Sequence, residues 1–193
     1  MSAASASFQK IMDTAEALIQ EKDCRQMTLQ DIIQRSGLSK GAIYHYVSGK
    51  DELLGLILKS RVERANKRFD EAVRDPGSSG MEKPLRSIAE GMLQATRYDN
   101  VTNKIFTYLL SQADQPKIAA VLDEVHEFTL RTCASWVETG QRSGYIPAEA
   151  DGRKLAESLL TFMYGMRVQS TIKREAFRVT EDELIRFMSR TLS

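Results

Sequence analysis

Residues 28–54, TLQDIIQRSGLSKGAIYHYVSGKDELL, have the pattern of two short helices joined by a tight turn. Thr28 stands in the position of a helix N-cap, and Gly37 stands where the first helix must end in a conformation with positive φ. Ser39 is a second N-cap candidate, for a helix that we expect over residues 40–46. This spacing predicts a helix-turn-helix whose second helix enters the major groove of DNA.

The second helix of this motif would present a small and polar face. Ile43 and Tyr46 lie three residues apart and mark its buried side. The unpaired N–H groups at the start of the helix and the charge of Lys40 favour a phosphate, while Gly41 lets the backbone approach and Ala42 can touch a thymine methyl. The outward positions, and hence the candidate DNA contacts of this helix, are Lys40, Gly41, Ala42, Tyr44 and His45.

Other residues of this predicted interface have two interpretations. Thr28 and Ser39 are expected either to contact phosphates or to act only as helix caps, because both roles use the same side-chain hydroxyl. Tyr44 is expected at a phosphate, with sideways packing into the core as the alternative, and His45 is either a DNA contact or a solvated side chain. Lys50 opens the next helix, where a cation is unfavourable without an anion nearby, so we expect it to hold a second phosphate.

One run within this stretch carries a family resemblance. Residues 41–47, GAIYHYV, followed by Lys50 and Leu53, resemble the recognition helix and the next helix start of TetR-type bacterial transcriptional regulators. The resemblance covers roughly residues 8–60 and implies a helical C-terminal region that encloses a small-molecule pocket and forms a homodimer. Three residues depart from the family's usual Ala, Ala and Phe, respectively: Ile33, Ser36 and Val47.

Composition narrows the classes of protein that this chain can belong to. Its 193 residues fit one or two small domains, and 42% hydrophobic residues are enough for a substantial core. With a formal net charge of +1, contact with DNA must come from the local placement of positive groups. Neither a signal sequence nor an apolar run of about 20 residues is visible, so we expect a cytoplasmic protein without membrane contact. Cys24 and Cys133 are expected as buried thiols, with a disulfide or redox switch as the alternative.

The rest of the chain shows helical spacing of apolar residues and no strand-like alternation, which predicts an all-α fold. The clearest loop, at 75–80, suggests a DNA-binding domain over 1–49, a connecting helix over 50–74 and a ligand-binding and dimerisation domain over 75–193. Thr180 and Glu183 form a possible capping box for the last helix. Helices are expected over 8–22, 50–73, 85–95, 101–110, from 116 to before 143, over 151–173 and from 180, after a frayed tail at 1–7.

The segment 155–172 is apolar around much of its circumference, so it must be buried on several sides. With the last helix, it predicts a dimer built from two helices of each chain, which suits a helix-turn-helix that reads palindromic half-sites. The alternative is a single helix buried at the centre of a monomer. The residues that we expect at the interface are Leu159, Met163 and Phe187.

We find no catalytic constellation, phosphate loop or paired cysteine ligands, and therefore predict no enzyme, cofactor or metal site. Glu124, His126 and Glu127 would lie on different faces of a helix, which favours structural or solvated side chains over a shared metal site. The TetR resemblance implies a mostly apolar effector pocket, although each candidate taken alone is better explained as core. These candidates are Met92, Phe106, Tyr108, Leu109, His126, Thr129, Cys133, Trp136, Phe162 and Met166.

The hypothesis that follows is a homodimeric repressor that leaves a palindromic DNA operator when an unidentified small apolar effector binds. Two alternative functions are also compatible with the sequence. One is an activator, or a regulator of the same fold that responds to a protein partner. The other is an all-α carrier that no longer binds DNA.

Overall fold

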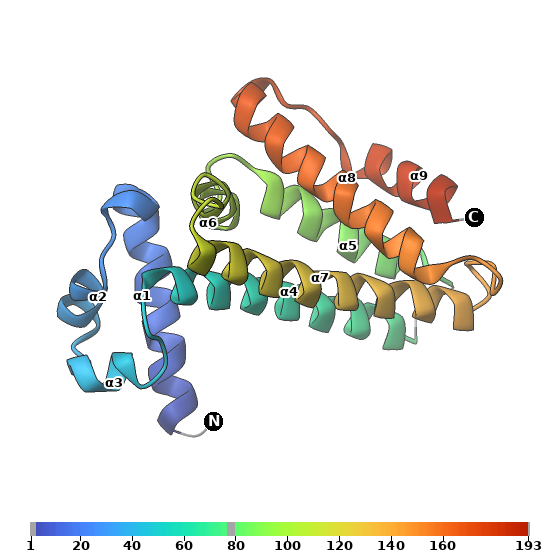
Figure 1. The fold of residues 1–193 in the computed structure, drawn as a ribbon. Helices are drawn as coiled ribbons and strands as arrows, with labels where there is room; N and C mark the ends of the chain where they lie inside the picture. The colour runs from blue at the N-terminus through green and yellow to red at the C-terminus, as the bar shows by residue number, and fades with distance from the viewer. Residues whose placement is uncertain (1–2, 77–79, 193) are drawn as a thin grey trace. The chain divides into compact units, whose positions relative to one another are not determined.

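The computed structural model describes residues 3–76 and 80–192, and within these residues it is built from helices without a strand (Figure 1). The predicted all-α fold is therefore confirmed. The helices are α1 (Ala3–Gln26), α2 (Leu29–Ser36), α3 (Lys40–Tyr44), α4 (Lys50–Arg74), α5 (Glu82–Thr96), α6 (Val101–Leu110), α7 (Pro116–Arg142), α8 (Gly152–Lys173) and α9 (Glu181–Leu192), with a 3-10 turn, η1 (Arg174–Ala176), after α8.

Contacts divide the described residues into two compact units. The first unit contains the chain up to Leu58 together with Asp99–Val125, and the second contains Lys59–Tyr98 together with the chain from His126 onward. Both α4 and α7 contribute residues to each unit. The boundary expected near residue 75 therefore does not divide the chain as the contacts do, because α6 packs against α1. Part of the loop expected there, residues 77–79, lies outside the described residues.

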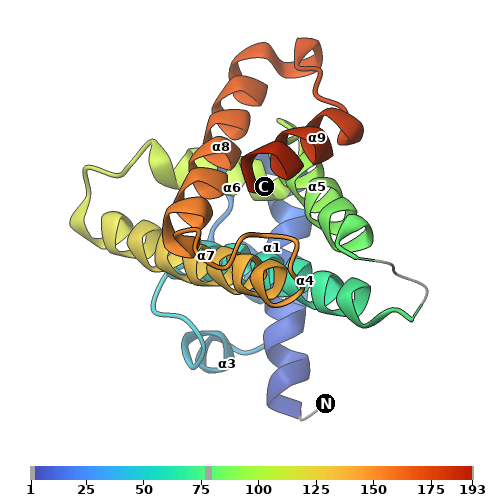
Figure 2. The ribbon, with the colours of Figure 1, turned by 90° about the vertical axis from the view of Figure 1, so that its right-hand side faces the viewer.

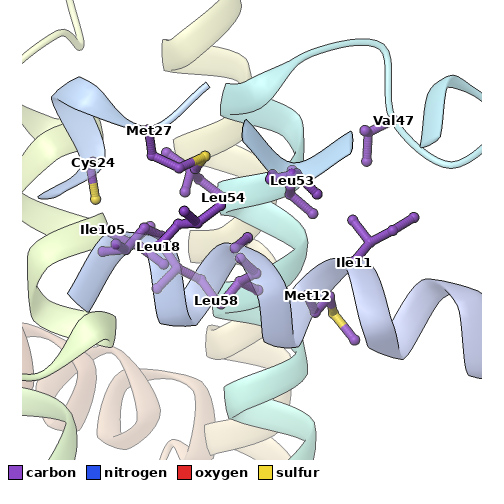
Figure 3. Packing of buried hydrophobic residues seen from close by; sticks show 14 of the residues in the cluster. Ile11, Met12, Leu18, Cys24, Met27, Val47, Leu53, Leu54, Leu58 and Ile105 are labelled. Atoms are coloured by element: carbon purple, nitrogen blue, oxygen red, sulfur yellow. The ribbon is translucent and has the colours of Figure 1, made fainter. Parts of the chain in front are cut away.

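The first unit is organised around one apolar core shared by α1 to α4 and α6. Leu18 of α1, Leu54 of α4 and Ile105 of α6 are buried side by side in it (Figure 3). Ile43 of α3 and Ile32 of α2 are completely buried in the same cluster. Each of these side chains contributes about 1.5–3 kcal/mol when it leaves water. The helix-turn-helix is thereby fixed to α1 through its own apolar residues.

Helix α1 is longer than its apolar pattern predicts. It begins at Ala3, whereas we expected a frayed tail over residues 1–7, of which residues 1 and 2 lie outside the described part. Alanine has the highest intrinsic helix propensity, so this small-residue segment forms helix without apolar periodicity. At the other end, Asp23 has φ of 72° and breaks the helix next to Lys22, where the sequence predicts its end.

The second unit has its own core, contributed by α5, α8, α9 and the later parts of α4 and α7. Helix α5 packs against both α8 and α9 (Figure 2). Asp151 caps α8 by accepting a hydrogen bond from the Lys154 N–H at 3.1 Å. The capping box predicted for α9 is present, since Thr180 N–H donates to the Glu183 carboxylate and Glu183 N–H donates to Thr180 Oγ1. No helix within the described residues is both long enough and apolar enough to cross a lipid bilayer.

Candidate DNA interface and effector region

Both ends of α2 are held by local hydrogen bonds. Thr28 Oγ1 accepts from the Asp31 N–H at 3.2 Å, and the Asp31 carboxylate accepts from the Thr28 N–H at 2.8 Å, which completes a capping box. At the other end of α2, Gly37 has φ of 66° and donates its N–H to the Ile33 carbonyl oxygen at 3.2 Å. Both ends of α2 are therefore satisfied within the chain, and the Thr28 hydroxyl serves as a cap.

The Asp31 carboxylate predicts a pH-dependent part of the stability. Hydrogen bonds from Lys22 and then from Thr28 lower its pKa from 3.8 to about 2. A carboxylate with a lowered pKa stabilises the folded state while it is ionised, so its contribution is complete above 3.8 and is lost as the pH falls to about 2. We expect Asp31→Asn to lower the Tm at neutral pH, and the difference from the unmodified protein to shrink through that window. Thermal denaturation followed by circular dichroism checks this, and a difference that does not change with pH would contradict it.

Helix α3 carries the face expected to meet DNA. Ser39 Oγ accepts from the Ala42 N–H at 3.1 Å and so caps the helix. Ile43 is completely buried, whereas Tyr44 is 47% exposed, which rules out the alternative in which Tyr44 packs into the core. The Lys40 ammonium lies 5.6 Å from the centre of the Tyr44 ring. The exposed face of α3 therefore combines the cation of Lys40, at the start of the helix, with the aromatic hydroxyl of Tyr44.

Gly41 and His45 complete this face. Gly41 is exposed, and a Cβ added to it would meet only Ser39 Oγ, at 4.0 Å. Hence the free protein has room for a side chain at this position. His45 is exposed at the end of α3, and its ring lies edge-on to Tyr46 with centres 5.1 Å apart. Ala42, between the outward and inward positions, is half-buried.

The ammonium of Lys50 has partners within the protein. It donates to the Cys24 carbonyl oxygen at 3.1 Å and lies 4.9 Å from the centre of the Tyr108 ring. Lys50 thus connects the start of α4 to the end of α1 and to α6. The phosphate contact expected of Lys50 finds no support in this geometry, and Asp51 and Glu52 already place negative charge in the first turn of α4.

We therefore expect Lys50→Ala to act on the first unit rather than on the salt dependence of DNA binding. Removal of the ammonium leaves the Cys24 carbonyl without this donor and should cost about 1.5 kcal/mol of stability. Operator affinity measured over a series of salt concentrations should keep its slope. A slope reduced by about one would instead assign Lys50 to a phosphate.

The three departures from the usual family residues fit this core. Ser36 is buried, and its Oγ accepts from the Leu38 N–H at 3.2 Å. Val47 is also buried, and Ile33 is half-buried against the same apolar cluster. The departures therefore leave the turn and the position of α3 intact.

A sequence comparison identifies this unit. The family described as "Bacterial regulatory proteins, tetR family" matches residues 11–57, which span the helix-turn-helix and the helices that support it. The chain is a TetR-type transcriptional regulator. Regulators of this family bind DNA and small-molecule effectors, are dimers and are not enzymes.

Similarity to individual proteins extends beyond the DNA-binding helices. The HTH-type transcriptional regulator TtgR of Pseudomonas putida is 27% identical to this chain over 168 residues, which cover 81% of this chain and 76% of TtgR. Salmonella enterica GusR superposes with a TM-score of 0.67 at 20% identity, covering 100% of this chain and 98% of GusR. The SmeT–triclosan complex has a TM-score of 0.67 at 18% identity, covering 97% and 90% of the two chains. At these identities the two solved structures show a shared fold.

The ten residues expected around an effector fall into both units of this TetR-type regulator. Leu109 is completely buried in the core of the first unit, and Tyr108 packs against the same core, over Lys50. Phe106 also belongs to the first unit and is buried. Tyr108 and Leu109 are accounted for by the core of the first unit. The other seven lie in the second unit: Met92, His126, Thr129, Cys133, Trp136, Phe162 and Met166.

Within the second unit, polar groups from α7 and α8 meet among apolar side chains. His126 Nδ1 lies 3.3 Å from the Tyr164 hydroxyl, and the two ring centres are 6.0 Å apart. One turn along α8, Arg167 is only 6% exposed. Burial lowers the pKa of Arg167 to about 10 and raises that of Tyr164. Sequence reasoning missed Tyr164 and Arg167, although a basic residue within the apolar stretch 162–168 is a visible signal.

Two further candidates have defined partners. Trp136 donates its Nε1–H to Asn66 Oδ1 at 2.7 Å, and its ring centre lies 5.5 Å from that of Phe69. Phe162 stacks on Phe187 with ring centres 4.1 Å apart. Trp136 thus links α7 to α4, while Phe162 links α8 to α9.

The residues expected at a dimer interface differ in their exposure. Leu159 is buried in the core of its own unit, so it is not available to a second subunit in this arrangement. Met163 is half-buried and Phe187 is 38% exposed. The apolar side chains that α8 exposes are instead Val168 and Ile172, which are one turn apart. Because α8 has apolar residues on several sides, the sequence alone could not indicate which of these sides is exposed to solvent.

Proposed function

We propose that this regulator is a ligand-responsive repressor, which binds a palindromic operator as a homodimer and is released by a small, largely apolar effector. The observation that carries the DNA-binding part is the exposed face of α3, held outward because Ile43 is buried beneath it. Since a regulator must reach the DNA that it binds, we also propose that the protein acts in the cytoplasm.

On the operator, Lys40 and the start of α3 would hold a phosphate, while Ala42 and His45 would face base edges. Tyr44 would reach the backbone beside Lys40, which positions the helix without reading sequence. A homodimer that reads two half-sites on one face of the duplex needs its α3 helices about 34–36 Å apart.

For the effector, we propose the interior of the second unit. Met92, Cys133 and Met166 supply apolar surface there, and His126 and Thr129 supply polar groups, a combination typical of small-molecule sites. The solved structure of SmeT, which shares this fold, is a complex with triclosan. An effector that binds one conformer more tightly than another shifts the population toward it, and release follows when that conformer no longer matches two half-sites.

For the dimer, we propose a two-fold contact made by the outer faces of α8 and α9. Val168 and Ile172 of α8 and Phe187 of α9 are large apolar side chains exposed on these helices. Their burial against a second copy would remove them from water, as it does in the interfaces of permanent dimers.

The experiment that tests this function is genome-wide footprinting of the bound sites, followed by transcription of the neighbouring genes with and without the regulator. We expect an inverted repeat whose half-site centres lie about one helical turn apart or a multiple of it. Higher transcription without the regulator supports a repressor, whereas lower transcription indicates an activator. The absence of protected sites would overturn the proposal in favour of a carrier.

A further inference from the structure

We propose that the effector is a hydrophobic anion whose carboxylate, or an equivalent anionic group, binds Arg167 of α8 with Tyr164 and His126 beside it. This inference rests on the proposed function and specifies the chemistry of its effector site. It adds an ionic contact to a site that the sequence predicts as mostly apolar.

Polar groups from α7 and α8 lie together inside the second unit. Arg167 is 6% exposed and therefore lies inside the second unit. Tyr164 precedes Arg167 by three residues on α8, and its electrostatic interaction with Arg167 partly offsets the lowering of the guanidinium pKa by burial. The Tyr164 hydroxyl lies 3.3 Å from His126 Nδ1 of α7. Residues three apart lie on the same face of a helix, so groups from two helices converge at one place.

The charge of Arg167 is largely removed from water. A guanidinium removed from water loses hydration, and burial is the largest influence on Arg167, lowering its pKa to about 10. At neutral pH the group is still a cation, and its surroundings on balance disfavour that cation. An anionic ligand would reverse this balance, because a guanidinium offers a planar pair of donors that matches a carboxylate.

The remainder of the ligand would meet apolar surroundings. Tyr164 packs against the apolar core of the second unit, to which Met166 of α8 and Leu130 and Cys133 of α7 belong, and all three of these are buried. A ligand that reaches Arg167 must therefore present apolar surface to these helices. Aromatic or aliphatic carboxylates combine the two properties, whereas small hydrophilic anions do not.

The test uses matched pairs of compounds that differ in charge and hardly in shape: 2-naphthoate with 2-naphthamide, and octanoate with octanamide. Binding to the full-length protein is followed through the fluorescence of Trp136, the chain's only tryptophan, and through the shift in Tm. We expect at least one carboxylate to bind about tenfold or more tightly than its amide, the difference expected for a charge-assisted hydrogen bond.

Variants assign that preference to Arg167. Arg167→Gln should remove the preference for the carboxylate while binding of the amide stays the same, and Arg167→Lys should restore only part of it because the fork geometry is lost. Tyr164→Phe provides a second measurement and should weaken carboxylate binding without loss of folding. Arg153→Gln is the matched control, since Arg153 is an exposed arginine on the same helix, paired with Glu157 at 3.0 Å.

The outcomes separate this inference from the proposed function. Equal binding of each carboxylate and its amide, no carboxylate binding at millimolar concentration, or a preference that persists in Arg167→Gln would overturn the inference. DNA binding measured in the same samples addresses the function independently. If amides bind and cause the protein to release the operator, the repressor proposal stands and the anionic site is wrong. If ligands bind without any effect on operator binding, the repressor proposal is wrong.

Discussion

Gly41→Leu should abolish operator binding while the protein stays folded and dimeric. In the free protein a Cβ at this position meets only Ser39 Oγ, at 4.0 Å, so the leucine side chain projects from α3 without a clash. On DNA the same side chain would occupy the space into which the start of α3 must move to reach phosphate and bases. We expect the affinity for the operator to fall by about a hundredfold or more, since several contacts are lost together.

Fluorescence anisotropy with the footprinted operator measures this loss, and circular dichroism and light scattering verify helicity and dimerisation. Gly41→Ala is the graded control, because a methyl group adds little bulk and should retain much of the affinity. Normal operator binding by Gly41→Leu would show that the backbone of α3 does not approach the groove at this residue.

A second large effect is expected from charge on the outer faces of α8 and α9. Ile172 is 70% exposed and Phe187 is 38% exposed, so Ile172→Glu in particular should leave the fold of the second unit intact. In a two-fold contact each substitution introduces two carboxylates, and an uncompensated buried charge costs about 3–5 kcal/mol. We expect monomers at micromolar concentration, with weak DNA binding because the two half-sites are no longer engaged together.

Light scattering and operator affinity, measured on the same preparations, check this result. Val73→Glu is the matched control, since Val73 is an exposed apolar residue of α4 in the second unit and lies outside the proposed interface. It should remain dimeric. Dimers that persist in both Ile172→Glu and Phe187→Glu would move the interface elsewhere, and a monomeric unmodified protein would remove it altogether.

Features encoded by neighbouring residues could be predicted closely. The capping box of Thr180 and Glu183 needs only residues three apart, and the bounds of α6, Val101–Leu110, agree with its apolar spacing. The positive φ of Gly37 likewise follows from the turn that the chain must make there. In these cases the same few residues determine both the pattern and the structure.

Features that depend on distant parts of the chain could not be predicted. A lysine at the start of a helix suggested a phosphate, but the side chain of Lys50 is directed by Cys24 and Tyr108, which approach it only in the folded unit. The pairing of Tyr164 with His126 depends in the same way on how α7 and α8 pack. Similarly, the loop near residue 75 marks a break in the chain, whereas the division into units depends on α6 returning to α1.

The two cysteines have a practical consequence for the study of this regulator. Cys24 lies in the first unit and Cys133 in the second, both are buried free thiols, and burial raises the pKa of each to about 12. A thiol in this state hardly reacts with an alkylating reagent until the surrounding structure opens. The labelling rate at each cysteine therefore measures how often its own unit opens, and the native chain carries a separate kinetic reporter for each of its two units.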